Sequence, residues 1–289
     1  MKPPPFRYAA PTSIAEALEL LVSHADDDAR VLAGGQSLVP LMNFRLASPS
    51  YLVDLRRVEE LTRIRTEDGM LVIGAMVRMA DAERSPEVAL AAPLLAEALG
   101  HVAHPPIRNS ATVGGSIAHA DPAAELPAVA LALDAEMVVT GADGTRTVAA
   151  QDFFHGPFTT AVAPGEILTE VRLPRRGGGH AFVEFARTHG NFGLVGVAAV
   201  VELDGDTVAR AAIALSGVAP TPVRATPAEE ALAGHAPDAA AVRAAAEAGA
   251  AALSPTGDVQ ASPETRVDIA RSCLRRGIEL AVSRAQDRR

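Results

Sequence analysis

The sequence contains very little cysteine and has no excess of positive charge. Cys273 is the single cysteine among 289 residues, so this chain cannot supply an internal disulfide, an iron–sulfur cluster or a cysteine-based zinc site. Acidic residues outnumber basic ones by 35 to 26, the net charge is -9, and no basic block stands out. This balance argues against binding to DNA, to other nucleic acids or to anionic membrane surfaces.

Long apolar runs are also missing. No stretch of the sequence approaches the ~20 apolar residues that a membrane-spanning helix needs. The proline-rich start, MKPPPFRYAAP, is unlike a signal peptide. We therefore expect a cytoplasmic protein whose contact with membranes is at most peripheral. A hydrophobic content of 48% is nevertheless ample for a packed core.

The order of strand and helix patterns indicates two regions. The segment PRRGGG, residues 174–179, is the best linker in the chain. After it, three strand candidates precede alanine-rich helices. We expect an α+β protein with domains at 1–175 and 180–289, the second being a small three-stranded antiparallel sheet with helices. Its expected strands are 180–187, 194–203 and 207–217, and its expected helices are about 226–233, 238–252 and 263–284.

The first region mixes short strands with helices. Ser13 and Glu16 fit a capping box at the start of a helix that begins at Ile14. A second helix is expected over 122–132, because Pro122 suits a first helical position. The remaining patterns predict strands at 31–33, 51–55 and 70–73, a hairpin of 136–140 with 145–148, and a helix over 87–101.

Two glycine motifs carry the strongest local signal. LAGGQSL spans residues 32–38 and TVGGS spans 112–116. Glycine permits positive φ and close approach of a ligand, and successive amides in such a turn can bind an anion. Two opposed turns suit a pyrophosphate, and the alternative is that both serve packing alone. The sequence has neither a GxxxxGK[ST] loop nor a GxGxxG after a strand, so Walker and Rossmann scaffolds are excluded.

Four segments in order extend this signal over nearly the whole chain: LAGGQSLVPLMNFRLASPSYLVDL, HPPIRNSATVGGSIAHADPAAELPAVALALDAEMVV, GEILTEVRLP and FVEFARTHGNFGLVGVAAVV. Together they resemble the FAD-binding medium subunit of molybdenum hydroxylases, the family of carbon monoxide dehydrogenase medium subunits and the xanthine dehydrogenase flavin domain. The resemblance implies a two-part FAD-binding domain of the PCMH, or vanillyl-alcohol-oxidase, type and a small α+β C-terminal domain, with FAD between them.

The resemblance also implies which residues contact FAD. Glu125 falls where the family has an acidic residue, on the ribose or adenine side of the cofactor. Val102 and Leu168 fall at apolar contact positions. The remaining contacts would come from the two glycine motifs, namely Leu32, Ala33, Gly34, Gly35, Gln36, Ser37, Leu38, Thr112, Val113, Gly114, Gly115 and Ser116.

Several other residues have side chains that could contact a cofactor or bind a metal ion. The family often has a lysine near Glu184, so no role is carried to this acidic position. Phe192 is a candidate neighbour of the isoalloxazine ring, with plain core packing as the alternative. His101 and His104 lack a third ligand nearby in sequence, so no metal site is expected. Cys273 lies on an apolar helical face and is expected to be buried.

The resemblance implies the flavoprotein subunit of a molybdenum-hydroxylase-type oxidoreductase. FAD would receive electrons from a small subunit with [2Fe–2S] clusters and pass them to NAD, a quinone or O₂. A molybdopterin-binding large subunit would oxidise the organic substrate, in a heterohexamer-like assembly. No residue of this chain is expected to be catalytic, because the flavin carries the chemistry. Two alternatives stay open: a standalone FAD-dependent oxidase or dehydrogenase, and a flavin-free binding module.

Overall fold

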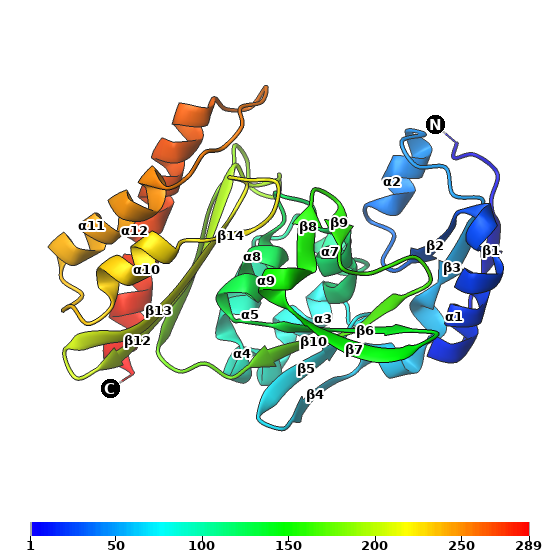
Figure 1. Cartoon of the computed structure of the whole chain (residues 1–289), viewed down its shortest axis with the longest axis horizontal. Coiled ribbons are helices and arrows are strands. Elements are labelled where there is room, and N and C mark those ends of the chain that lie inside the picture. Colours follow the sequence, from blue (N-terminus) through cyan, green and yellow to red (C-terminus); the bar gives the residue numbers. More distant parts are fainter. Residues whose placement is uncertain (1, 289) are drawn as a thin grey trace.

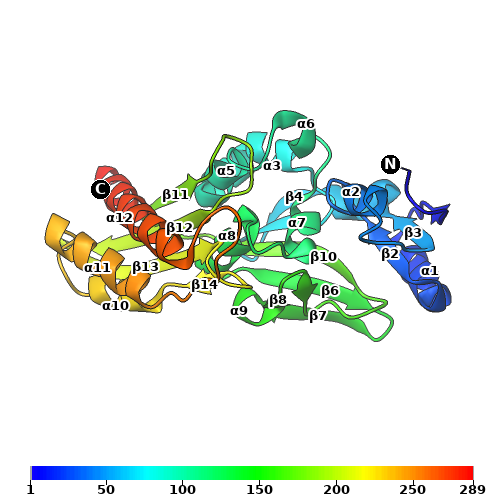
Figure 2. The same ribbon diagram turned by 90° about the horizontal axis from the view of Figure 1, so that it is seen from above.

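The computed structural model describes residues 2–288. Figures 1 and 2 show three parts in chain order along the long axis: a small N-terminal sheet, a central five-stranded sheet with helices, and a C-terminal sheet with three helices. Within the described residues, no helix is long and apolar enough to cross a membrane.

The N-terminal part is a three-stranded parallel sheet, in the order β1 (Arg7–Ala9), β3 (Tyr51–Asp54) and β2 (Ala29–Leu32). Ser13 caps the helix that packs on this sheet, because its hydroxyl accepts from the Glu16 amide at 3.2 Å. The Glu16 carboxylate reaches back to the Thr12 amide, at 2.8 Å, and not to Ser13 as the capping box predicts. The helices of this part are α1 (Ile14–Ser23), η1 (Ala25–Asp27), α2 (Leu38–Asn43), η2 (Leu55–Arg57) and η3 (Glu59–Thr62).

The central part is an antiparallel sheet that carries the largest core cluster. Its strands run in the order β4 (Ile64–Glu67), β5 (Met70–Gly74), β10 (Ile167–Pro174), β6 (Glu136–Gly141) and β7 (Gly144–Ala149). A separate two-stranded ribbon consists of β8 (Phe154–Gly156) and β9 (Thr159–Thr160). The helices of this part are α3 (Met79–Arg84), α4 (Pro86–Ala91), α5 (Pro93–Leu99), α6 (Pro105–Arg108), α7 (Val113–His119), α8 (Glu125–Ala132) and α9 (Ala150–Phe153).

Two predicted helices of the central part differ from the structure. The single helix expected over 87–101 is divided into α4 and α5, because Pro93 has no N–H with which to continue a helix. The helix expected from Pro122 begins only at Glu125. Before it, the Asp121 carboxylate accepts from the Ala123 amide at 2.9 Å, which closes a turn there instead of a helical one.

The C-terminal part is an antiparallel sheet between two helical layers. It contains the three predicted strands, and a two-residue fourth strand extends it: β11 (Gly179–Phe185), β12 (Val195–Asp204), β13 (Thr207–Ser216) and β14 (Val223–Arg224). One face packs on α12 (Pro263–Asp287) and α10 (Thr226–Leu232), and α11 (Ala239–Ala251) packs on both of these helices. The other face packs on α5 and α8, so this sheet joins the core of the central part.

An ionic cluster reinforces this junction. The Asp134 carboxylate, just after α8, accepts from Arg176, Arg210 and Arg224 at distances of 2.7, 2.5 and 2.8 Å. Nearby, Glu97 of α5 pairs with Arg284 of α12 at 2.6 Å. The central and C-terminal parts are therefore held together by both apolar packing and charge pairs.

Candidate functional site

The first glycine motif forms an open loop at the end of β2. Gly35 has φ of +73°, a conformation that favours glycine. Within residues 2–288, the backbone amides of residues 34–37 donate no hydrogen bond to another protein group. The Gln36 side chain donates to the Gly34 carbonyl at 3.1 Å and holds the loop together. These amides are therefore free to bind an anion.

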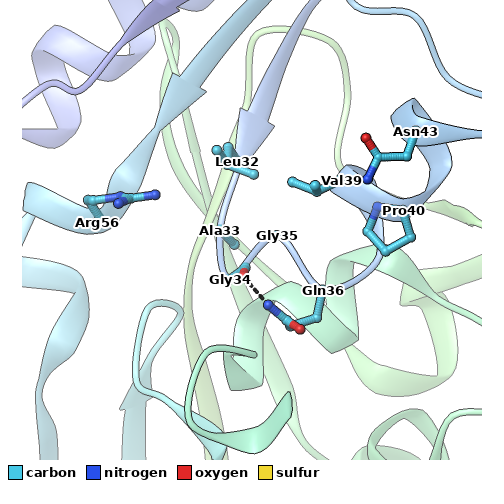
Figure 3. Close-up of a pocket in the computed structure, with 9 residues that line it drawn as sticks. All are labelled: Leu32, Ala33, Gly34, Gly35, Gln36, Val39, Pro40, Asn43 and Arg56. Carbon is cyan, nitrogen blue, oxygen red and sulfur yellow. Dashed lines mark hydrogen bonds between the residues drawn. The ribbon is translucent and has the colours of Figure 1, made fainter. Parts of the chain in front are cut away.

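The loop borders a pocket of about 280 Å³. Figure 3 shows that loop residues form one side of it, that the start of α2 forms another, and that Arg56 lies across from them. The residues that line this pocket are Leu32, Ala33, Gly34, Gly35, Gln36, Val39, Pro40, Asn43 and Arg56. The motif at 32–38 therefore combines free amides with a cavity and a positive charge.

Arg56 is a site residue that the sequence interpretation missed. It follows β3, and β3 is parallel to β2, so the ends of both strands meet at one edge of the sheet. Asp54 is fully buried, and it forms an ion pair with Arg56, whose Nε lies 2.6 Å from the Asp54 Oδ2 atom. The Asp54 carboxylate also accepts hydrogen bonds from the Arg56 backbone amide at 2.9 Å and from the Tyr8 hydroxyl at 2.8 Å. The Arg56 side chain is 64% exposed. Asp54 therefore anchors a guanidinium group that remains accessible to a ligand.

The second glycine motif is not an open turn, so that prediction is wrong. It is the start of α7, and neither Gly114 nor Gly115 has positive φ. The Thr112 hydroxyl caps the helix and accepts from the Gly115 amide at 3.0 Å. The amides of residues 113, 114 and 116 donate to the carbonyls of Val77, Ala75 and Thr112. All four amides at this helix start are thus already bonded within the protein.

The two motifs nevertheless touch each other. A Cβ atom on Gly34 would lie 2.2 Å from the carbonyl oxygen of Ser110, which is two residues before the second motif. A Cβ on Gly115 would lie 3.3 Å from the Cβ of Ala33. Glycine is required at position 34 because the two segments approach so closely. The second motif therefore forms a wall beside the loop, and the loop carries the free donors.

Two predicted contact residues and Phe192 lie away from the pocket lining. Val102 and Leu168 are buried in the central core cluster. Phe192 is 65% exposed, on the loop between β11 and β12, so the alternative that it packs in the core is wrong.

Cys273 is buried as predicted, and burial raises the pKa of its thiol to about 11. No cluster of metal-ligating side chains occurs among the residues that the structure describes.

Glu125 and Glu184 are buried carboxyl groups at the junction of the central and C-terminal parts. Glu125 is the first residue of α8 and is 7% exposed. Burial raises its pKa to about 7, although a hydrogen bond from its own amide acts in the opposite direction. The Glu184 side chain on β11 is 6% exposed. Burial, and then the nearby Glu125 carboxyl, raise the pKa of Glu184 to about 8.

Glu184 also lacks a partner. Its Oε1 atom is buried and makes no hydrogen bond to any residue that the structure describes. Its Oε2 atom lies 3.8 Å from Nδ1 of His101, which is too far for a hydrogen bond. Burial lowers the pKa of His101, so near pH 7 both groups are uncharged and the contact is not an ion pair. An unpaired buried acceptor costs free energy, so this oxygen is suited to accept a hydrogen bond from a bound group.

These features fit FAD, the cofactor that the sequence resemblance implies. A pyrophosphate requires N–H donors, and residues 34–37 with Arg56 supply them. The cofactor's hydroxyl and ring N–H groups require acceptors, and the unpaired Glu184 oxygen is one. When bound, FAD supplies electron-transfer chemistry, which no side chain of this protein can supply.

Comparisons with known proteins agree with this fit. Residues 4–176 match the family model of the FAD binding domain in molybdopterin dehydrogenase, and residues 180–281 match that of the CO dehydrogenase flavoprotein C-terminal domain. The 6-hydroxypseudooxynicotine dehydrogenase complex subunit alpha of Paenarthrobacter nicotinovorans is 41% identical, covering 99% of this chain and 97% of that protein. The carbon monoxide dehydrogenase medium chain of Hydrogenophaga pseudoflava is 40% identical, covering 98% and 99%.

Solved structures show the same similarity. Carbon monoxide dehydrogenase from Hydrogenophaga pseudoflava, lacking the Mo-pyranopterin moiety of its cofactor, matches with a TM-score of 0.96 at 41% identity over 99% of this chain and 100% of the other. Quinoline 2-oxidoreductase from Pseudomonas putida 86 matches with a TM-score of 0.95 at 40% identity over 99% of each. The predicted fold and FAD are confirmed, and the flavin-free alternative is wrong. The chain belongs to the family of FAD-binding medium subunits of molybdenum-hydroxylase-type dehydrogenases.

Proposed function

We propose that this chain transfers electrons between an iron–sulfur partner and a soluble or quinone acceptor. Its FAD would take electrons from a small subunit with [2Fe–2S] clusters and pass them to NAD, a quinone or O₂. The observation that carries this proposal is the loop of residues 34–37, whose free amides border a pocket with Arg56. With its one cysteine buried, the chain must obtain iron–sulfur clusters from another chain.

Different residues of the chain would contact different parts of FAD. We propose that the loop amides and Arg56 bind the pyrophosphate, while residues 112–116 support the loop and contribute side-chain and surface contacts. Glu125 would accept from a hydroxyl group of the cofactor, and Val102 and Leu168 would shape the apolar wall behind it. We place the boundary between the FAD-binding domain, 1–175, and the C-terminal domain, 180–289, at the glycine-rich segment before β11.

The proposed partners follow from the same family. The relatives are named as a complex subunit and as medium chains, which supports assembly with a molybdopterin-binding large subunit and a [2Fe–2S] small subunit. A heterohexamer-like arrangement, a cytoplasmic location and at most peripheral membrane contact remain our proposals. The substrate of the complex would bind to the large subunit and not to this chain.

One experiment tests both the cofactor and the electron path. The purified chain should release FAD, and not FMN alone, when it is denatured and the extract is separated by chromatography. Under anaerobic conditions, small organic donors should leave the bound flavin oxidised until the two partner subunits are added. Rapid bleaching by a small donor with this chain alone would instead support a standalone FAD-dependent oxidase or dehydrogenase.

A further inference from the structure

The starting observation is a buried carboxylate beside the first glycine motif. Asp54 is fully buried at the end of β3, and its register partner on β2 is Leu32, which begins the motif and lines the pocket. Arg56 lies two residues further along the chain and lines the same pocket. A buried charge is costly unless it is paired and hydrogen-bonded, so Asp54 must keep its partners in fixed places.

Three contacts fix the Asp54 carboxylate. The Arg56 backbone amide donates to its Oδ1 at 2.9 Å, and the Tyr8 hydroxyl donates to its Oδ2 at 2.8 Å. The Arg56 Nε lies 2.6 Å from the same Oδ2. Tyr8 belongs to β1, which is paired with β3, whereas Arg56 belongs to η2. Because its two oxygens are bonded from different segments, the carboxylate cannot rotate freely, and Oδ2 holds the guanidinium group at Nε.

The far end of the Arg56 side chain is left available. Within residues 2–288, neither of its Nη atoms donates a hydrogen bond to a protein group. The side chain is 64% exposed and lies across the pocket from the loop (Figure 3). A guanidinium group held at Nε presents its Nη donors as a fixed fork, the geometry that recognises phosphate. An arginine that is not held would lose rotamer freedom on binding and bind more weakly.

We propose that Asp54 and Tyr8 are positioning residues for the pyrophosphate of FAD and act through Arg56. This inference rests on the proposed FAD site, because it requires Arg56 to contact the pyrophosphate. The alternative is that Asp54 only neutralises the Arg56 charge. The two alternatives predict opposite signs. A carboxylate near an anionic ligand repels it, so its removal would strengthen FAD binding unless the carboxylate is needed to orient the guanidinium group.

The variant Asp54→Asn separates these alternatives. Its side-chain oxygen can still accept from the Arg56 backbone amide, and its NH₂ group can donate to the Tyr8 oxygen, so the start of η2 and the contact with β1 are kept. The same NH₂ group meets the Arg56 Nε as donor against donor, and the guanidinium group is released. We expect the Kd for FAD, measured by flavin fluorescence titration of the full chain, to rise roughly fivefold.

Two further variants check whether this effect is specific. Tyr8→Phe keeps the ring and removes the hydroxyl that holds Oδ2, so we expect the Kd to rise roughly threefold. Asp27→Asn is the matched control for the loss of a carboxylate charge. Asp27 pairs with Arg7 of β1 and does not line the pocket, so its removal should leave the Kd unchanged.

A double-mutant cycle distinguishes positioning from a general effect on the fold. In the Arg56→Ala background there is no guanidinium group to orient, so adding Asp54→Asn should not weaken FAD binding further. A purely structural Asp54 would weaken binding equally in both backgrounds. Arg56→Lys supplies a test that leaves Asp54 intact. Lysine keeps the charge but has a single nitrogen, which Asp54 would hold, so this variant should bind FAD about as weakly as Arg56→Ala.

The outcomes are distinct. An Asp54→Asn variant with a Kd equal to or below that of wild type, or equal weakening in both backgrounds, overturns the positioning role while the proposed function stands. If Asp54→Asn does not fold, Arg56→Lys decides, because a wild-type Kd for that variant would show that charge alone is sufficient. Failure of the wild-type chain to bind FAD overturns the proposed function and this inference together.

Discussion

The two glycine motifs are similar in sequence, yet their backbones have different surroundings. In AGGQS the amides of residues 34–37 have no hydrogen-bond partner among the protein groups of residues 2–288, and Gly35 has positive φ. In TVGGS every amide from 113 to 116 is bonded internally, and the glycines are helical. A GG pair followed by serine therefore does not by itself define an anion-binding loop. What differs is whether the surrounding chain already uses the amides.

The neighbouring elements explain this difference. The second motif lies against the residues after β5, where the carbonyls of Ala75 and Val77 accept its amides. The first motif follows β2 at the edge of a parallel sheet, and Ser37 makes no capping hydrogen bond at the start of α2. Substitutions in the first motif should therefore mainly reduce FAD affinity, and substitutions in the second motif should mainly reduce the stability of the fold.

The largest expected effect is that of Gly114→Val. A Cβ atom there would lie 2.4 Å from the Cβ and 2.5 Å from the Cα of Ala75, and backbone cannot move aside as a flexible side chain can. Overpacking typically costs about 1–3 kcal/mol, and this contact lies at the severe end. We expect loss of cooperative thermal unfolding by circular dichroism. A cooperative transition within about 2 °C of wild type would show that the second motif is not a packing element.

Gly35→Val should reduce FAD binding and leave the protein folded, in contrast to Gly114→Val. Its Cβ would meet only Val39, at 3.3 Å, and Leu32, at 3.5 Å, so there is room for it, but the φ of +73° does not suit a branched residue. The loop should relax to negative φ and lose the alignment of its amides. We expect a folded protein whose FAD affinity is reduced at least tenfold, or about 1.4 kcal/mol. Near-normal FAD occupancy would mean that the loop amides do not bind the cofactor.

Arg56→Ala should weaken FAD binding and leave the protein folded, because the buried Asp54 carboxylate keeps its hydrogen bonds from the Tyr8 hydroxyl and from the backbone amide of residue 56. A charge-assisted hydrogen bond to phosphate is worth about 1.5 kcal/mol or more, so we expect the Kd to rise roughly tenfold. This effect should shrink at high salt, which screens an exposed charge. Arg57→Ala is the matched control, since the neighbouring arginine does not line the pocket. Equal Kd values for both variants would remove Arg56 from the site.

Local signals in the sequence predicted most of the C-terminal part. The helices after β14 begin near their predicted positions, because caps such as Ser262 and Asp238 act within a few residues. Arg56 was missed because its position depends on β3 lying parallel to β2, a pairing of segments distant in the chain. The amides of TVGGS were misjudged for the same reason, since their partners are carbonyls of Ala75 and Val77. The divided helix at Pro93 could have been read from the sequence alone.

The smallest expected effects come from the hydroxyl groups of the two motifs, and they separate the motifs most directly. Thr112→Val removes the cap of α7 and leaves the Gly115 amide unpaired, so we expect a stability loss of about 1 kcal/mol and a Tm lower by roughly 2 °C. Ser37→Ala removes an exposed hydroxyl that caps nothing, so its Tm should not change. Instead its FAD affinity should fall roughly two- to fivefold, by about 0.5–1 kcal/mol. Thermal unfolding of the apoprotein and FAD titration well below the Tm measure the two effects independently. A Thr112→Val variant that has an unchanged Tm and binds FAD more weakly than Ser37→Ala would contradict this assignment. It would indicate that the second motif binds FAD.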